Sequence, residues 1–425
     1  MKILLFSYLF ACVTLFGQPQ KNHPSLLPII PFETEVITIP QVDSSFSLYY
    51  IYKIPYRLLV FERNEESYNA SFRIIVEVSD DDGKLVTRDI KDNKIVVNKF
   101  EETSEKNLFL QDYLSFKVDL GNYKVGAIIS DMNSSDERPL KPFDIKLDKE
   151  SEKLILQPIV TVPEEIKCNE NNAVILANFG GKIPFSSDKF NLIIPLTDTS
   201  ITEIEVIMKN NDEEVYSGKI VDSYVDHLGI ENCEGKIIFT SASENVPTRN
   251  FVLKYVNKNL NEGKLLLQIK NDEKQIDEKL DLNVVWFNKP FSLFNPEKAI
   301  ELLSYIETED VIDDLLSADE PEYPKVLQNY WAKYDPTPET SFNEIMSEYY
   351  NRIDYAIKEF SSISNNNGAK TDRGMVYIRF GEPDTINRTS NSQGEVIEIW
   401  IYSNTQRKFT FIDKIGTGNF TLTEN

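Results

Sequence analysis

The chain has 425 residues, of which 41% are hydrophobic and 27% are charged. This composition is typical of folded domains and excludes a disordered polymer, and the length allows about two to four domains. The formal net charge of −23 gives a surface that repels phosphate groups, which argues against nucleic acid and anionic lipid as partners. An aromatic content of 11% favours strands.

The first 17 residues have the pattern of a signal peptide. Lys2 precedes an apolar run from Ile3 to Phe16, and the small residue Gly17 follows it. The run is shorter than the roughly 20 residues that a membrane helix needs. We therefore expect export to the periplasm, the cell surface or the medium, with cleavage after residue 17 and no transmembrane segment afterwards. The alternative is a lipoprotein lipidated at Cys12, although that cysteine comes early and apolar residues follow it.

Residues 18–155 and 156–287 predict two antiparallel β-sandwiches. Both contain short segments in which apolar and polar residues alternate between Gly, Asn and Asp turns, without helical spacing. One such segment is Phe72–Val78, and Asp82-Gly83 after it predicts a hairpin. The segment DLGNYKV resembles the Leu-x-Gly-x-Tyr corner of immunoglobulin-like and fibronectin-like domains. The resemblance implies that the hydroxyl of Tyr123 bonds to backbone upstream of its strand.

Two cysteines remain after cleavage at the predicted site, Cys168 and Cys233. Both fall in the second predicted sandwich, where an oxidising compartment would allow them to form one disulfide. Two separate buried thiols are the alternative. Their spacing fits neither a metal site nor a redox pair.

Residues 288–425 change in pattern from strands to helices followed by strands. Asn295-Pro296-Glu297 is a helix-start signal, and helical spacing of apolar residues predicts three helices after it. The sequence therefore predicts a mainly β chain with a C-terminal α+β domain. The expected helices lie within residues 295–318, 323–334 and 340–363, and the expected strands lie at 374–380, 396–403, 408–414 and 418–424.

The C-terminal region also carries an ordered series of motifs: Tyr330-Trp331, Asp335-Pro336-Thr337-Pro338, Asn343-Glu344, Glu348-Tyr349-Tyr350 with Arg352, Thr371-Asp372-Arg373-Gly374, Gly381-Glu382-Pro383-Asp384, and Glu398 with Trp400 and Tyr402. In order and spacing this series resembles the GWxTD domain family of exported bacterial proteins, whose function is unassigned. The resemblance implies preceding β-sandwich domains and supplies no reaction. The chain departs from the family at its name, because Ala369 stands where the pattern has Trp.

Histidine chemistry is nearly excluded by the sequence. The two histidines, His23 and His227, lie in no spacing typical of a zinc site, a Cys–His nucleophile or a Ser–His–Asp triad. No phosphate-binding loop or dinucleotide fingerprint occurs in the required context. The acidic segment Ser79–Lys84 lacks the ligand ladder of a calcium loop, and a hairpin turn explains it. We therefore expect no cofactor and no metal.

Carboxylate-only catalysis is compatible with the sequence, since glycosidases need only two acids across a cleft. The acids in the motif-rich region also have structural explanations as turn and cap residues. The two arginines of the motifs are expected to form ion pairs with these acids and so hold loops to the helix. The residues concerned are Asp335, Asp372, Asp384 and Glu398, with Arg352 and Arg373, and with Trp331 and Trp400 as aromatic side chains able to stack on a sugar or fill the core.

Two functions from different classes follow. The favoured hypothesis is an exported, non-catalytic interaction or structural protein of the cell envelope, whose sandwiches act as spacers for a domain that contacts a protein or a glycan. The alternative is a carboxylate-based glycan hydrolase, which requires an open pocket holding two acids. The candidate contact residues are Trp331, Asp335, Arg352, Asp372, Arg373, Asp384 and Trp400.

Overall fold

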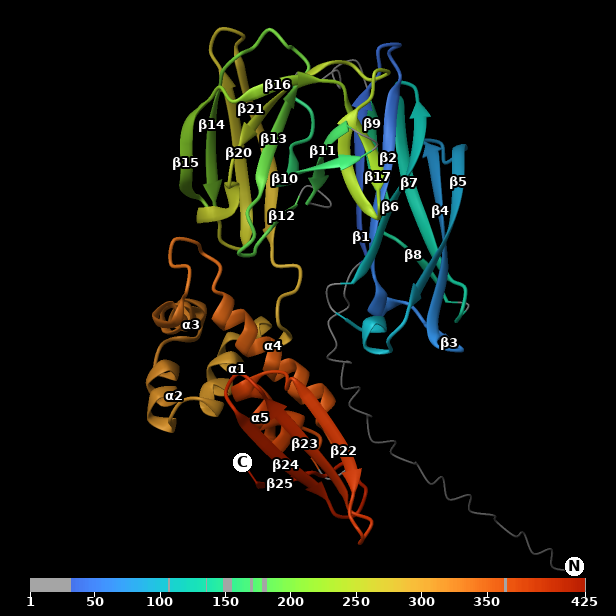
Figure 1. Ribbon diagram of the computed structural model, residues 1–425. Coiled ribbons are helices and arrows are strands. Elements are labelled where there is room, and N and C mark those ends of the chain that lie inside the picture. Colours follow the sequence, from blue (N-terminus) through green and yellow to red (C-terminus); the bar gives the residue numbers. More distant parts are fainter. Residues whose placement is uncertain are drawn as a thin grey trace, which may run out of the picture. The chain divides into compact units, whose positions relative to one another are not determined.

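The computed structural model describes residues 32–105, 108–134, 136–147, 155–168, 171–177, 182–362 and 365–424. The predicted signal peptide, residues 1–17, lies outside this part of the chain. Strands predominate in the described residues, and the α-helices all follow residue 295 (Figure 1). The predicted fold class, mainly β with a C-terminal α+β domain, is therefore confirmed. None of the helices in these ranges has the length and hydrophobicity needed to cross a membrane.

The first nine strands form two antiparallel sheets. The strands are β1 (Glu33–Pro40), β2 (Phe46–Pro55), β3 (Glu62–Asn64), β4 (Ser67–Asp80), β5 (Leu85–Val97), β6 (Phe109–Val118), β7 (Gly121–Asp131), β8 (Glu137–Pro139) and β9 (Phe143–Leu147). One sheet has the order β1-β2-β6, and the other is built around β4 and β7, with β5 paired to β4. Every second residue of β4 from Ala70 to Val78 is buried in the core between the sheets, as the alternation predicts.

Two turns predicted for this sandwich are present. Asp80 ends β4, and its carboxylate accepts hydrogen bonds from the backbone N–H groups of Asp82 and Lys84. Gly83 has a φ of 75°, a conformation that glycine adopts without strain. At the other predicted corner, the hydroxyl of Tyr123 donates a hydrogen bond of 3.0 Å to the backbone carbonyl of Asp119. The acidic segment is thus a hairpin turn, and the tyrosine corner is confirmed.

The next twelve strands form a second pair of sheets. They are β10 (Ile159–Cys168), β11 (Asn171–Leu176), β12 (Lys182–Pro184), β13 (Asn191–Leu196), β14 (Ile204–Asn210), β15 (Glu213–Ile220), β16 (Ser223–Asp226), β17 (Leu228–Cys233), β18 (Lys236–Ser241), β19 (Thr248–Leu253), β20 (Gly263–Asn271) and β21 (Ile276–Val285). The orders are β16-β19-β13-β10-β11-β18-β17 and β12-β21-β20-β14-β15. The short β12 pairs with β21 in parallel, against the antiparallel expectation, because about 100 residues separate the two strands and no hairpin fixes their direction.

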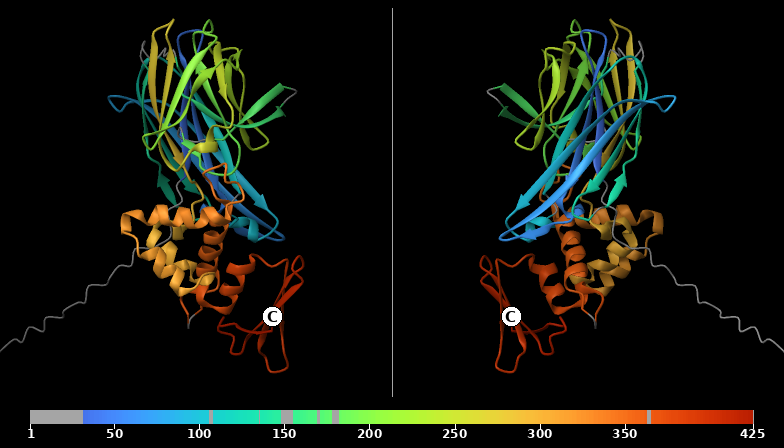
Figure 2. Two further views of the ribbon diagram at one scale, coloured as in Figure 1. Left: turned by 90° about the vertical axis from the view of Figure 1, so that its left-hand side faces the viewer. Right: turned by 90° about the vertical axis from the view of Figure 1, so that its right-hand side faces the viewer.

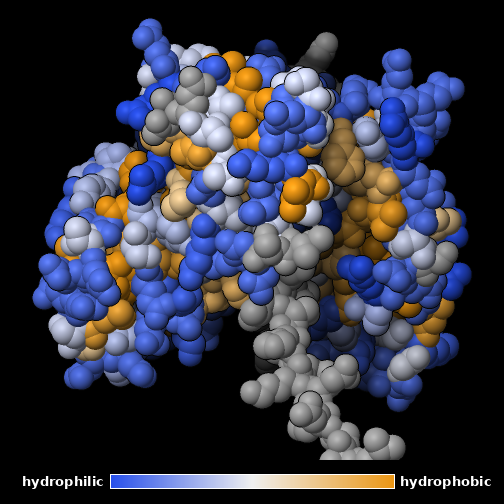
Figure 3. Space-filling model, turned by 90° about the horizontal axis from the view of Figure 1, so that it is seen from below, coloured by the Kyte–Doolittle hydropathy of each residue, from blue (hydrophilic) through white to orange (hydrophobic). Residues whose placement is uncertain are grey.

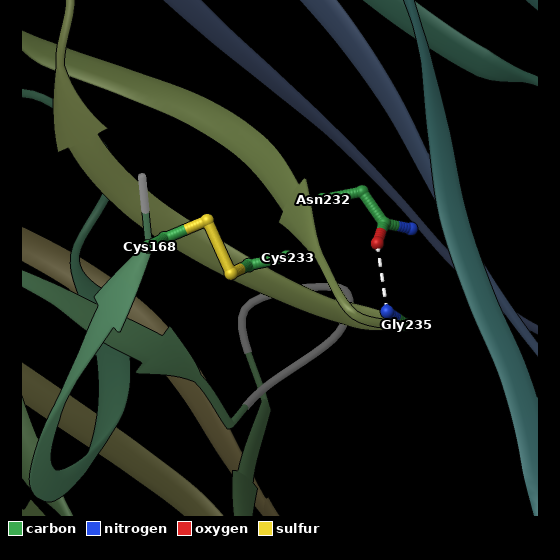
Figure 4. The surroundings of a disulfide bond; sticks show 4 residues. All are labelled: Cys168, Asn232, Cys233 and Gly235. Atoms are coloured by element: carbon green, nitrogen blue, oxygen red, sulfur yellow. Dashed lines mark hydrogen bonds between the residues drawn. A yellow bond between two sulfur atoms is a disulfide. The ribbon is translucent and has the colours of Figure 1, made fainter. Parts of the chain in front are cut away.

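A disulfide joins two strand ends in this second sandwich. Cys168 is the last residue of β10 and Cys233 is the last residue of β17, and their Cα atoms lie 6.1 Å apart (Figure 4). The turn after Cys233 is held by the side-chain oxygen of Asn232, which accepts a hydrogen bond of 2.9 Å from the backbone N–H of Gly235. Both cysteines are buried beside Ala173. Of the two alternatives left by the sequence, the structure contains the bonded pair.

The C-terminal region has helices followed by an antiparallel sheet. Its elements are α1 (Pro296–Glu301), α2 (Glu309–Leu316), α3 (Tyr323–Trp331), α4 (Glu344–Glu359), α5 (Asp372–Phe380), β22 (Thr385–Ser390), β23 (Val396–Tyr402), β24 (Arg407–Asp413) and β25 (Thr421–Glu424). The four strands pair in chain order. Helices α4 and α5 lie against the sheet (Figures 1 and 2), with ring contacts such as Phe360 on Trp400 and Phe380 on Phe409.

Two expectations for this region were wrong, and one strand was missed. The first predicted helix is divided into α1 and α2 by a 3-10 turn at Leu302–Tyr305. The acids Glu309 and Asp310 favour the start of a second helix at residue 309. Residues 374–380, predicted as a strand, belong to helix α5. Strand β22 was not predicted, because all six of its side chains are exposed and so show no alternation.

Candidate functional site

Glu398 is the buried centre of a polar cluster between α5 and the small sheet, in which the side chain of Arg388 stays 65% exposed. Glu398 lies on β23, where every second residue from Glu398 to Tyr402 is buried, and is only 2% exposed. Its Oε2 accepts hydrogen bonds from Nε and Nη2 of Arg388, at 2.9 and 2.5 Å. Its Oε1 accepts one of 2.7 Å from the indole N–H of Trp400, and Nη1 of Arg373 lies 3.6 Å away. Both oxygens of this carboxylate are therefore satisfied by protein donors.

Arg373 connects this cluster to the end of the chain. It is 8% exposed, and its Nη2 donates a hydrogen bond of 3.3 Å to the backbone carbonyl of Gly418. Its guanidinium lies 4.1 Å from the ring centre of Phe420 and 5.2 Å from that of Phe360. Burial lowers the pKa of Arg373 from its ordinary value, and the neighbouring charge of Glu398 opposes this effect. We call Arg373, Arg388, Glu398 and Trp400 the Glu398 cluster.

The signature segment, residues 368–374, forms a tight helix start against α4. The hydroxyl of Thr371 accepts a hydrogen bond of 3.1 Å from the N–H of Gly374 and thereby caps α5. A Cβ on Gly368 would lie 2.1 Å from the carbonyl oxygen of Ala356, and one on Gly374 would lie 2.0 Å from that of Gly368. Ala369, at the position of the family's Trp, is fully buried. The segment therefore serves close backbone packing.

Asp372 joins the start of α5 to the last strand of the sheet. It occupies the first turn of the helix, where a negative charge interacts favourably with the helix dipole. Its Oδ2 accepts a hydrogen bond of 2.7 Å from the backbone N–H of Leu422 in β25. The Asx turn expected at this position is thus replaced by a helix cap at Thr371 and a contact between two elements.

The turn after α5 gathers a second set of motif residues. Gly381 has a φ of 79°, and a Cβ there would lie 3.0 Å from the guanidinium of Arg352. The hydroxyl of Tyr402 donates a hydrogen bond of 2.9 Å to the carbonyl of Gly381. Asp384 accepts one from the backbone N–H of Ser403, which fixes the turn to the end of β23. The turn is consequently held from both α4 and the sheet.

Arg352 lies beside the exposed Tyr355 and the half-buried Tyr377 on this face. Its Nε donates a hydrogen bond of 2.6 Å to Glu348, one turn earlier in α4, so the expected ion pair with the motif aspartates is not formed. The rings of Tyr355 and Tyr377 are stacked with centres 4.5 Å apart. Burial raises the pKa of Tyr377, and the charge of Arg352 opposes this shift. We call Arg352, Tyr355 and Tyr377 the α4–α5 face.

Trp331 and Asp335 lie elsewhere, in the connection between α3 and α4. Trp331 is 2% exposed and packs against Tyr349 and Tyr350. The carboxylate of Asp335 accepts a hydrogen bond of 2.9 Å from the backbone N–H of Thr337, the Asx turn that Asp before Pro favours. Neither residue belongs to the Glu398 cluster or to the α4–α5 face.

The seven predicted contact residues thus separate into groups. Arg373 and Trp400 join Glu398, Arg352 and Asp384 flank the turn at Gly381, and Asp372, Trp331 and Asp335 hold local connections. Sequence reasoning missed Arg388, Tyr355 and Tyr377. The register of β22 against β23 pairs Arg388 with Glu398 directly, and that register could not be derived from a strand without alternation.

Two surface cavities lie away from these groups. One of about 630 Å³ is lined by residues of β5, β6 and β17, and another of about 220 Å³ is lined by residues near the starts of α1 and α3. None of the predicted contact residues lines either cavity. Within the described ranges, no three His, Cys, Asp or Glu side chains are placed to hold a metal ion.

Comparison with known proteins gives one family match. Residues 266–424 match the GWxTD domain family; this region begins within β20, upstream of the change in pattern at residue 288. No curated protein matches the chain. Among solved structures, a similarity to "Titin Ig tandem domains A164-A165" covers 60% of this chain and 98% of that chain, at 10% identity and a TM-score of 0.13, too low to carry an argument. The C-terminal region of this chain, residues 266–424, is therefore a GWxTD domain.

Proposed function

We propose that the chain is an exported, non-catalytic interaction protein of the bacterial cell envelope. In this proposal the β-sandwiches are spacers, and the GWxTD domain contacts a protein or a glycan. The main support for the absence of catalysis is the environment of Glu398, the most buried acid of the motifs. Its two carboxylate oxygens already accept hydrogen bonds from Arg388 and Trp400. A catalytic acid must reach a substrate atom within hydrogen-bond distance, and this carboxylate is enclosed.

The remaining motif acids support the same proposal. Asp335, Asp372 and Asp384 each accept a hydrogen bond from a backbone N–H. These bonds fix a loop, a helix start and a turn, respectively. A glycosidase needs a raised-pKa acid and a second carboxylate facing a shared space, whereas these acids lie on separate connections of the fold. The hydrolase alternative has no comparable support.

The α4–α5 face is the surface of this domain best suited to a partner. Arg352 is 28% exposed and Tyr355 is 41% exposed. Arginine and tyrosine are enriched among residues that dominate binding energy, because they combine large contact area with directional polar groups. In the view of Figure 3, hydrophobic residues are interspersed among polar ones. A guanidinium beside a stacked pair of rings can contact a partner through both charge and aromatic stacking.

The partner contact can be tested with the chain beginning at residue 18. This chain is immobilised and exposed separately to solubilised envelope proteins and to envelope polysaccharide. We expect binding of one of the two, reduced at least about tenfold by Arg352→Ala combined with Tyr355→Ala. Arg379→Ala, an exposed arginine on α5, is the matched control and should bind normally. Full binding by the double variant would contradict the placement of the site.

Catalysis and export are tested separately. We expect no release of reducing ends from peptidoglycan or envelope polysaccharide; release that Glu398→Gln abolishes while the protein stays folded would establish the hydrolase instead. For export, we expect a fusion of residues 1–40 to a reporter to be recovered outside the cytoplasm with an N-terminus at residue 18. Recovery of an intact N-terminus in the cytoplasm would contradict export, and a lipid on Cys12 would favour the anchored form.

A further inference from the structure

The outward face of the six-stranded sheet carries an apolar row that crosses four strands. Because every second residue of β4 is buried, Ile75 lies on the opposite, outward face. The register pairs Ile75 with Ile90 of β5 and with Ile128 of β7, and pairs Ile128 with Pro139 of β8. Ile90 and Ile128 are 43% and 38% exposed. We call these four residues the isoleucine row; its strands are labelled in Figure 1.

Opposite charges flank this row in a defined order. On one side of it, Arg73 of β4 is paired with Asp92 of β5 through hydrogen bonds of 2.6 and 2.9 Å. On the other side, Glu77 of β4 is paired with Arg88 of β5, with 3.7 Å between the charged atoms. The charges are therefore reversed across the row. On the Arg73 side β4 is positive and β5 is negative, and on the Glu77 side β4 is negative and β5 is positive.

The face as a whole is neutral, in a chain whose net charge is −23. Two copies of an acidic chain repel each other over most of their surface. A neutral face does not add to this repulsion. Cross-strand partners share a face of a sheet, so the register identifies the outward charged residues of its strands. The basic ones are Arg73, Arg88, Lys94, Lys124 and Lys146, and the acidic ones are Glu62, Glu77, Asp92, Glu137 and Asp144.

We propose that this face binds a second copy of the chain, with a two-fold axis along the isoleucine row. Such a rotation places each side chain of the row against its own copy. It also exchanges the two flanking sides, so that Arg73 lies opposite the partner's Glu77 and Asp92 lies opposite the partner's Arg88. An isologous interface must be self-complementary in this way, and the reversal of signs across the row provides the complementarity.

The next positions along the strands are compatible with this arrangement. Ser71 is paired with Lys94 on one side, and Ser79 is paired with Lys124 on the other. The rotation brings Ser71 opposite the partner's Ser79, and neither lysine meets another lysine. The apolar area is small, so the dimer should be weak and reversible, as expected for interfaces below about 1,200 Å².

The first experiment is sedimentation of the chain beginning at residue 18 over a concentration series. We expect a monomer–dimer equilibrium that Ile90→Glu abolishes, because each new carboxylate would face its own copy across the axis. Val225→Glu changes a residue that is 49% exposed on β16 and is the matched control, which should dimerise normally. A chain that stays monomeric at every concentration up to about 1 mM, or a dimer that persists in Ile90→Glu, would overturn the proposal.

The second experiment distinguishes this geometry from any other self-association. Glu77→Arg alone should be monomeric, because the new arginine faces the partner's Arg73; Arg73→Glu alone should be monomeric for the corresponding reason. Mixed together, the two variants should form a heterodimer, since each altered residue then faces an opposite charge. Dimers that persist in either single variant, or a mixture that stays monomeric, would overturn the proposed axis.

Discussion

At the scale of single residues, the motif side chains of the GWxTD domain act as connectors between helices and sheet. Arg373 of α5 is joined to β23 by the 3.6 Å contact between its Nη1 and Oε1 of Glu398, and the same oxygen accepts the 2.7 Å hydrogen bond from Trp400. A buried charge is tolerated only where paired charges and hydrogen bonds compensate its lost hydration. Such residues are recognisable in a sequence as a motif, although their type alone does not separate a structural role from a catalytic one.

Asp413 provides a prediction of pH dependence at this scale. Burial tends to raise the pKa of its carboxyl, but backbone N–H groups of the 415–418 loop, including those of Ile415 and Gly418, lower it below the ordinary 3.8. Because the pKa of Asp413 is lower in the folded state, its contribution to stability is fully present above pH 3.8. This contribution is lost as the pH falls through the pKa of the folded state. Asp413→Asn should therefore be less stable than the unaltered chain near neutral pH.

The measurement is urea unfolding of both proteins over a pH series. The difference in unfolding free energy between the two proteins should stay constant above pH 3.8 and shrink below pH 3.8. Other carboxylates titrate equally in both proteins and cancel in the difference. A difference that grows as the pH falls would contradict the role assigned to Asp413.

At the scale of elements, long periodic segments were predictable and short apolar ones were not. The alternation in Phe72–Val78 and the helical spacing within 340–363 correspond to β4 and α4. Residues 374–380 are seven mostly apolar residues, and so short an apolar run fits a strand as well as a helix. The structure forms α5 there because Thr371 caps it and Gly374 allows its first turn to approach Gly368. That close approach is tertiary information.

The packing of α5 predicts the effect of two glycine substitutions. Gly368→Ala and Gly374→Ala should each reduce the unfolding free energy of the C-terminal domain by about 3 kcal/mol, since a Cβ would lie 2.1 or 2.0 Å from a backbone oxygen. Met375→Ala on the same helix changes a residue that is 38% exposed and should cost at most about 1 kcal/mol. Thermal unfolding of the three variants compares them, and glycine variants as stable as Met375→Ala would refute the close packing.

At the scale of the whole molecule, sequence patterning identified the fold class but not the pairing of distant strands. Turn chemistry and alternation are local, so they predicted sandwiches and the tyrosine corner at Tyr123. The parallel pairing of β12 with β21 and the register of β22 on β23 connect segments without a shared local signal. The sequence singled out Arg373, Glu398, Trp400 and Arg352, but not Arg388, Tyr355 or Tyr377, because these three residues are placed beside them by strand register and helix packing.

The disulfide gives a prediction at this scale. A bond between cysteines 65 positions apart restricts the unfolded chain and should stabilise the second sandwich by up to about 4 kcal/mol. Cys168→Ser combined with Cys233→Ser should lower the unfolding temperature of that sandwich and leave the unfolding of the C-terminal α+β region, residues 288–424, unchanged. Calorimetry measures both transitions, and thiol titration of the protein purified without reductant should find neither cysteine free. Two free thiols would contradict the pairing.

The most direct test of the central claim is the unfolding free energy of Glu398→Gln measured in urea. If the motif residues hold the GWxTD domain together, this variant should lose about 3 kcal/mol, because the buried guanidinium of Arg373 would keep its charge without the carboxylate that compensates it. Glu382→Gln, an exposed acid in the neighbouring turn, should lose at most about 0.5 kcal/mol. Equal stability of the two variants would contradict a structural role for the Glu398 cluster and would reopen the hydrolase alternative.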